Sequence, residues 1–258
     1  MPSKFSLIKW YMDCVTEQGD ALIVYCAELH WRGMQIAYSS VLSAIDGATA
    51  THSSLVRYRL SLTEGQILIE FPRLDVVGRW KADASSVQRT VYENATGAVI
   101  WNCLQPRSQV NLWIGGREFV GLGYAECLTL TLPPWQLPMR QLRWGRFVSR
   151  EDSLAWVDWQ GDYSTSFAVY NGRECETRAV SDTEVAIPGV NLRMEESYSL
   201  RAGQLGTTVL PAAPALGRLL PRSLFNIREQ KWRSRGSLNA HERNSRGWVI
   251  HEVVHWKQ

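Results

Sequence analysis

The dominant pattern in this sequence is an alternation of apolar and polar positions with a period of two residues. Between residues 56 and 62, apolar side chains at the even positions alternate with Arg57, Arg59 and Ser61. Residues 128–132 alternate leucine with threonine in the same way. Because successive side chains of a strand point to opposite faces, this pattern predicts β-strands with one buried face.

Segments of this kind recur along the chain, separated by turns rich in Gly, Pro and Asn, and no amphipathic helix interrupts them convincingly. This spacing is typical of an all-β sandwich or barrel. A turn is expected at 105–108, and in 216–232 a short helix or irregular connection competes with a strand. The expected strands are 10–15, 21–27, 56–62, 67–71, 90–92, 99–104, 110–114, 128–132, 153–159, 166–170, 184–187, 198–200 and 247–256.

Prolines mark the best internal boundary. Pro133 and Pro134 end the strand before them, because proline has no backbone N–H to donate to a ladder. The length of 258 residues allows one large β domain or two smaller ones. The shared rhythm of the two halves favours an N-terminal lobe at 1–132 and a C-terminal lobe at 139–258, joined by 133–138.

The chain holds twelve tryptophans, which indicates either an aromatic core or an enclosed apolar cavity. The five cysteines are odd in number, widely spaced and without a C-x-x-C pair, so we expect reduced core thiols. The side chains expected to bind a ligand in such a cavity are Trp31, Trp101, Trp113, Trp144, Trp159 and Arg143.

The net charge of +3 conceals a basic segment at 218–246, which has eight basic residues against Glu229 and Glu242. Such a segment is either a solvated face or a peripheral contact with an anionic membrane. We expect no nucleic-acid partner. The first apolar stretch is too short, and too interrupted by Lys9 and Asp13, for a secretory signal, so the expected location is the cytoplasm.

His251 to His255 matches H-E-x-x-H, a zinc signature when it lies on a helix. The β-branched residues around it favour a strand, where positions i and i+4 lie about 13 Å apart, too far for one tetrahedral ion. We therefore expect no metal here, and no other motif indicates a cofactor.

Gly121-Leu-Gly-Tyr-Ala-Glu126 begins like a dinucleotide-binding loop but lacks the third glycine and the following helix. The two glycines indicate a tight turn or a close backbone approach. Tyr124 and Glu126 are two residues apart, so on a strand they share one face. They form a candidate acid pair.

Several short elements in order along the chain resemble the carotenoid 1,2-hydratase (hydroxyneurosporene synthase) family. The resemblance implies two lipocalin-like (calycin) β lobes, of barrel or sandwich type, with an apolar site at or between them. It also implies a hydratase, lyase, cyclase or isomerase that needs no cofactor. The matching elements are 10–11, 22–25, 121–126, 142–147, 156–159 and 247–252.

The chemistry of a buried acid agrees with that resemblance. A carboxylic acid surrounded by aromatic rings can protonate an isoprenoid, polyene or polyketide-like alkene, and the rings stabilise the resulting cation. Glu126, with Tyr124, is the first candidate, Asp158 the second and Glu28 the third. Two alternatives stay open: a non-catalytic carrier or sensor of an apolar ligand, and a structural protein with a dry aromatic core.

Overall fold

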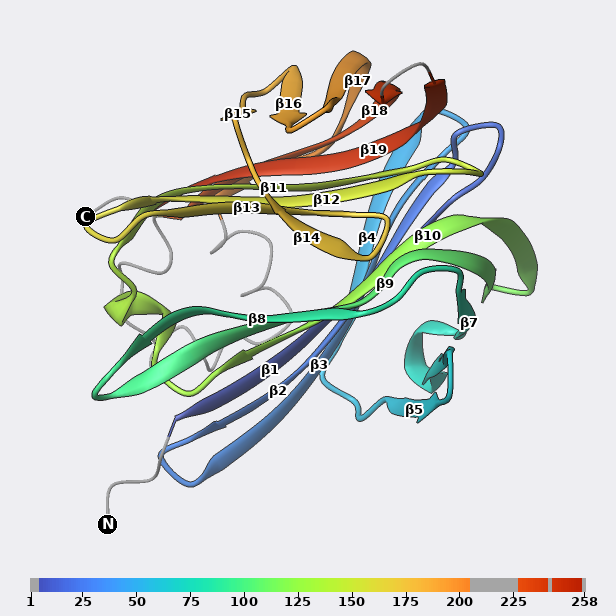
Figure 1. Cartoon of the computed structure of the whole chain (residues 1–258). Coiled ribbons are helices and arrows are strands. Elements are labelled where there is room, and N and C mark those ends of the chain that lie inside the picture. The colour runs from blue at the N-terminus through green and yellow to red at the C-terminus, as the bar shows by residue number, and fades with distance from the viewer. Residues whose placement is uncertain (1–4, 205–226, 241–242, 257–258) are drawn as a thin grey trace. The chain divides into compact units, whose positions relative to one another are not determined.

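The structure is a computed structural model that describes residues 5–204, 227–240 and 243–256. It is all-β, with two antiparallel sheets, and this confirms the predicted fold class of two lipocalin-like lobes (Figure 1). Helical structure in the described residues is restricted to two short 3-10 turns, η1 (Pro72–Leu74) and η2 (Pro134–Gln136). The chain divides into unit 1, Met1–Gln136, and unit 2, Leu137–Gln258.

Unit 1 contains a ten-stranded sheet in the order β4-β3-β2-β1-β10-β9-β7-β6-β5, with β8 paired to β9. The strands are β1 (Ser6–Val15), β2 (Ala21–Trp31), β3 (Met34–Ile45), β4 (Ala48–Ser54), β5 (Arg59–Thr63), β6 (Gln66–Phe71), β7 (Val76–Ala82), β8 (Val87–Asn94), β9 (Gly97–Ile114) and β10 (Arg117–Leu130).

Unit 2 contains a nine-stranded sheet in the order β14-β13-β12-β11-β19-β18-β17-β16-β15. The strands are β11 (Met139–Val148), β12 (Ser153–Gly161), β13 (Thr165–Tyr170), β14 (Arg173–Glu176), β15 (Ala179–Val180), β16 (Glu184–Ile187), β17 (Val190–Gln204), β18 (Arg228–Ala240) and β19 (Arg243–His255).

The strands of both sheets are connected in the same way. In each, the first strand pairs with the second strand on one side and with the last strand on the other: β1 with β2 and β10, and β11 with β12 and β19. The first and last strands of each unit are therefore neighbours near the centre of its sheet. The halves share this connectivity although no sequence repeat relates them.

The core of unit 1 lies on one face of its sheet, which we call the inner face. Met12 and Cys14 of β1 pack there in one cluster with Val41 of β3, Ile69 of β6 and Trp80 of β7. Strands from both ends of the sheet contribute, so the sheet must curl around this core. The opposite, outer face carries the alternate residues of each strand, among them those of the candidate site.

The core of unit 2 is built in the same way. Phe147 of β11, Trp156 of β12, Leu192 of β17 and Val249 of β19 are fully or almost fully buried in it. Gly145 has no side chain where the Trp156 ring passes, because a Cβ there would lie 2.2 Å from the ring.

The turn expected at 105–108 is wrong, because β9 runs without interruption through Pro106. On one side of β9, pairing with β8 ends at Cys103 and pairing with β7 starts at Ser108. On the other side, pairing with β10 passes from Gln105 directly to Ser108. Pro106 therefore lies where neither ladder needs a backbone N–H, and proline is tolerated at such irregularities.

Seven strands were absent from the sequence-based set: β3, β4, β7, β11, β14, β15 and β18. Two more, β10 and β17, were only touched by it. Residues 228–232 of the ambiguous 216–232 segment belong to β18, and 216–226 lie outside the described residues. The free thiols agree with the expectation of reduced cysteines. Cys14, Cys26 and Cys103 are buried, and Cys127 and Cys175 are partly buried.

Two glycines of β10 lie where the neighbouring strand β1 leaves no space for a side chain. A Cβ on Gly123 would lie 2.0 Å from the carbonyl oxygen of Asp13, and a Cβ on Gly121 would lie 2.2 Å from that of Val15. The Asp13 carbonyl also accepts a hydrogen bond of 2.7 Å from Nε1 of the buried Trp80. Both positions require glycine because β1 leaves no space for a Cβ, and neither glycine has a positive φ.

We predict that Gly123→Ala lowers the free energy of unfolding by about 1–3 kcal/mol, because the added methyl group must push β10 away from β1. Val120→Ala is the matched control, since Val120 lies on the same strand and is 58% exposed. Its cost should stay within about 0.5 kcal/mol. Urea unfolding measures both, and equal effects would contradict the close approach.

Candidate functional site

The candidate site is centred on the Glu126 carboxylate, on the outer face of β10. Trp101 Nε1, from β9, donates a hydrogen bond of 2.5 Å to Glu126 Oε2. The Tyr124 hydroxyl donates a second bond, of 2.8 Å, to the same oxygen. Trp101 and Tyr124 are buried and Glu126 is half-buried. Two rigid neutral donors therefore fix one carboxylate oxygen.

Aromatic rings and a thiol surround these groups. The ring of Tyr11, on β1, lies 6.1 Å from that of Tyr124 and 5.3 Å from that of Tyr25, both edge to face. Burial raises the pKa of Tyr124 well above its ordinary value, and Cys103 and Glu126 add to the shift. Burial also raises the pKa of the Cys103 thiol. At neutral pH both groups therefore keep their protons, and Tyr124 remains a hydrogen-bond donor.

The pairing of β10 with β9 is irregular beside this pair, because β9 contains extra residues there, whereas β10 pairs with β1 without a shift. The register of β10 against β9 shifts between Gly123 and Ala125 and again between Ala125 and Glu126. Tyr124 and Glu126 nevertheless stay on one face, as their spacing predicts, and their side chains are hydrogen-bonded to each other. Glu126 lies opposite Tyr11 of β1 on one side and Cys103 of β9 on the other.

Unit 2 carries a carboxylate in a comparable place with different partners. Glu252 of β19 lies opposite Trp144 of β11, as Glu126 lies opposite Tyr11. Glu252 forms an ion pair with Lys231, which is only 1% exposed, and the Lys231 Nζ lies 5.6 Å from the centre of the Trp144 ring. Removing one partner of a buried ion pair leaves an uncompensated charge. Glu252 is thus tied to a cation, whereas Trp101 and Tyr124 donate hydrogen bonds to Glu126.

The other predicted acids lie elsewhere. Asp158 is on β12, where its Oδ2 accepts a 2.8 Å bond from Gln160, and it lines an open depression of about 660 Å³ in unit 2. Glu28 is on β2, half-buried, with its Oε2 4.0 Å from His30 Nε2. Glu28 shares the inner face with the buried Cys26 and so faces away from Glu126.

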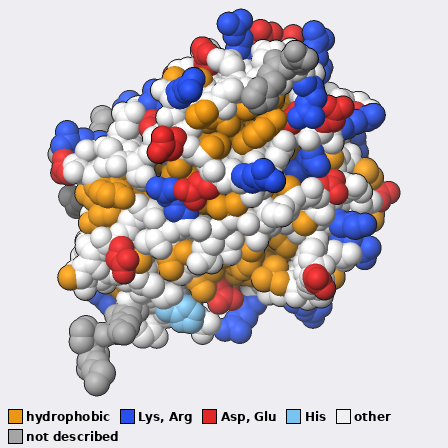
Figure 2. Space-filling model, viewed as in Figure 1, with side chains coloured by type: hydrophobic (Ala, Val, Ile, Leu, Met, Phe, Trp, Pro, Cys, Tyr) orange, Lys and Arg blue, Asp and Glu red, His pale blue; other side chains and the backbone are white. Residues whose placement is uncertain are grey.

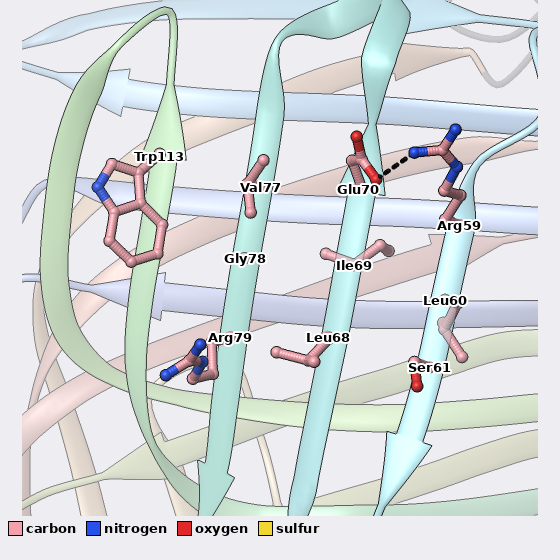
Figure 3. A pocket seen from close by; sticks show the side chains of 10 residues that line it. All are labelled: Arg59, Leu60, Ser61, Leu68, Ile69, Glu70, Val77, Gly78, Arg79 and Trp113. Carbon is pink, nitrogen blue, oxygen red and sulfur yellow. Dashed lines mark hydrogen bonds and ion pairs between the residues drawn. The ribbon is translucent and has the colours of Figure 1, made fainter.

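The predicted tryptophans of unit 1 fall into three separate groups. Trp101 contacts Glu126, as described above. Trp31 packs edge to face on Trp135, with ring centres 5.2 Å apart, and the Arg32 guanidinium lies 4.6 Å from its ring. Trp113 lines a hollow on the outer face (Figure 3).

In unit 2, Trp144 lies beside Lys231, and Trp159 packs on Tyr163 with ring centres 6.2 Å apart. Trp159 also lines the same depression as Asp158. Arg143 is held in place by a 3.1 Å ion pair with Asp182 and a 2.6 Å bond to Gln141.

His251 and His255 lie on strand β19, as the β-branched sequence predicts. Among the described residues, no group of three His, Cys, Asp or Glu side chains could hold a metal ion.

The structure reveals an arrangement around His251 that sequence analysis missed. His251 Nε2 lies 2.9 Å from Ser234 Oγ, and the ring stacks on Trp232 at 5.1 Å. Ser234 is fully buried, so a substrate cannot reach its hydroxyl group.

The described part of the basic segment belongs to β18 and β19, and partners hold several of its charges. Lys231 pairs with Glu229 and Glu252, and Arg243 pairs with Asp152. Arg218 and Arg222 lie outside the described residues. On the face shown in Figure 2, basic and acidic side chains are interspersed. Membrane contact therefore gains no support, and no described helix is long and apolar enough to span a bilayer.

Solved structures of low sequence identity share this fold. An AttH-like protein from Nitrosomonas europaea has a TM-score of 0.61 at 10% identity, covering 99% of this chain and 93% of that one. Kievitone hydratase from Nectria haematococca has a TM-score of 0.57 at 11% identity, covering 98% and 89%. CghA in complex with Sch210972 has a TM-score of 0.57 at 10% identity, with the same coverage. No protein-family model and no curated protein sequence matches the chain.

We predict that the indole N–H proton of Trp101 resonates downfield of an ordinary indole, because it donates a short bond to a carboxylate. Glu126→Gln should shift the resonance upfield, since a neutral amide oxygen accepts more weakly, and Tyr124→Phe should change it less. Nuclear magnetic resonance of protein with ¹⁵N-labelled tryptophan measures this, and Trp101→Phe assigns the signal. An unchanged signal in Glu126→Gln would disprove the bond.

A second prediction concerns His251. Burial lowers its pKa to about 4, with the nearby Asp182 opposing and Lys231 reinforcing the shift. The unfolded chain binds this proton near its ordinary value of 6.5, so stability falls as pH drops from 6.5 toward 4. Between pH 7 and about pH 4.5, the loss in urea unfolding should be on the order of 2–3 kcal/mol. His251→Gln should flatten this dependence, and a similar flattening in His255→Gln would contradict it.

Proposed function

We propose that this protein binds a hydrophobic small molecule and converts it by proton transfer from Glu126, in a hydration, isomerisation or cyclisation. The observation that carries the proposal is the Glu126 carboxyl group held by Trp101 and Tyr124 among aromatic rings. The shared fold of a hydratase and of CghA bound to Sch210972 supports it. So does the resemblance of residues 121–126 to the carotenoid 1,2-hydratase family.

The proton-donating step uses the two fixed hydrogen bonds. The reacting form of Glu126 is the protonated carboxylic acid. The π electrons of a substrate double bond take its proton, so that a C–H bond forms and a carbocation remains. The electron pair of the broken O–H bond stays on Glu126 as negative charge. Trp101 Nε1 and the Tyr124 hydroxyl already point at Oε2, so they stabilise this charge without reorganising. Ring faces such as that of Tyr11 stabilise the cation.

The fate of the cation decides the product. If a water oxygen forms the new C–O bond, the extra water proton returns to Glu126, and the net reaction is hydration. If an adjacent C–H bond gives its proton to Glu126, the double bond has moved. If a second double bond of the substrate attacks the cation, a ring forms, and loss of a proton to Glu126 completes the cycle. In every case Glu126 is restored.

We predict that Glu126→Gln lowers turnover at least about a hundredfold while the ligand is still bound, because only the proton donor is lost. Tyr124→Phe should have a smaller effect, since it removes one of two donors. Glu118→Gln is the matched control: it makes the same change on the same strand, where Glu118 contacts Asn111.

The measurement begins with native mass spectrometry of the freshly purified protein, which shows whether an apolar ligand is retained. Wild type and variants are then incubated with the extracted ligand and with a panel of isoprenoid, polyene and polyketide-like alkenes. A ligand that is bound but never changed by wild type would identify a carrier. Equal turnover in Glu126→Gln and wild type would disprove the assigned role of Glu126.

A further inference from the structure

The outer face of unit 1 has a second, separate hollow over strands β5, β6, β7 and β9 (Figure 3). Its volume is about 350 Å³, within the usual range of small-molecule sites. It lies at the opposite end of β9 from Trp101 and contains neither Tyr124 nor Glu126. The lining residues are Arg59, Leu60, Ser61, Leu68, Ile69, Glu70, Val77, Gly78, Arg79 and Trp113.

The floor of this hollow is apolar and accessible. Trp113 lies opposite Val77 in the β9–β7 ladder, and Leu68 lies opposite Arg79 in the β6–β7 ladder. Figure 3 shows Val77 between the Trp113 ring and the Arg59–Glu70 pair, and Leu68 beside Arg79. Val77 is 48% exposed. Covering these side chains with a flat apolar group removes their surface from water, which is favourable.

The charges around the floor select the ligand. Arg59 is neutralised by Glu70, with Nη1 and Oε2 2.9 Å apart. Arg79, in contrast, makes no hydrogen bond or ion pair with any described residue, so the hollow holds one uncompensated positive charge. Lys81, two residues further along the outer face of β7, adds a second cation without a described partner. A guanidinium group binds a carboxylate through two parallel hydrogen bonds.

We propose that this hollow binds a small amphipathic anion, whose carboxylate pairs with Arg79 and whose apolar body covers Val77 and Leu68 against the Trp113 ring. A cationic ligand is excluded by repulsion. A neutral apolar ligand would cover the floor but leave Arg79 without a partner. The site is independent of the proposed reaction at Glu126 and adds a second binding function to unit 1.

The test uses 2-naphthoate as the probe and the full chain with ¹⁵N-labelled tryptophan. The Trp113 indole signal, assigned with Trp113→Phe, should shift and saturate with added naphthoate. 2-Naphthalenemethanol, which has the same rings without the charge, should bind at least about fivefold more weakly. Dodecanoate is then added as a competitor: displacement extends the ligand class to fatty acids, and its failure restricts the class to aromatic acids.

Three variants separate this site from others. Arg79→Gln should weaken naphthoate binding at least about fivefold and leave the binding of the neutral alcohol unchanged. Arg57→Gln removes an equal charge from an exposed arginine outside the hollow and should change nothing. Glu126→Gln should also change nothing, so the outcome does not depend on the proposed reaction. The proposal is overturned if naphthoate leaves the Trp113 signal in place, or if Arg79→Gln and Arg57→Gln behave alike.

Discussion

The close approach of β10 to β1 at Gly123 is the constraint on which the rest of unit 1 depends. The first and last strands of the unit meet there, and any side chain at Gly123 would collide with the Asp13 carbonyl. Trp80 donates its indole N–H to that same carbonyl, which ties β7 to β1 beside Gly123. Tyr124 and Glu126 follow Gly123 directly on β10, and their side chains share the outer face. The fold and the candidate site therefore share one packing requirement.

The two units differ in the groups that surround their corresponding carboxylates. Glu126 and Glu252 occupy comparable positions on the last strands of their sheets. Trp101 and Tyr124 donate hydrogen bonds to Glu126, and Lys231 forms an ion pair with Glu252. The Lys231 ammonium compensates Glu252 in a buried pair, so moving a proton there would leave a cation without its partner. Trp101 and Tyr124 are neutral before and after Glu126 gives up a proton. Both groups can therefore keep their hydrogen bonds to Glu126 in either state.

The sequence was sufficient to predict the fold class and part of the site. Features that depend on neighbouring residues could be predicted, and features that depend on pairing between distant strands could not. Alternation is local, so most strands followed from it, as did the contact between Tyr124 and Glu126. The bond from Trp101 depends on the long-range register of β9 against β10, which no local pattern encodes. Pro106 was misread for the same reason, since its tolerance depends on where the neighbouring ladders begin and end. β3 was missed because its serines weaken the alternation.

The tryptophans illustrate why a composition signal does not locate a site. An indole has a large apolar surface and one N–H group that needs an acceptor when it is buried. Trp80 uses that group to join β7 to β1, and Trp156 fills the space above Gly145, so both have structural roles. Trp113 presents its ring beside an unpartnered guanidinium. Trp101 instead donates to an ionisable side chain that is still half-exposed. The partner of each indole, and not the number of indoles, separates a core residue from a functional one.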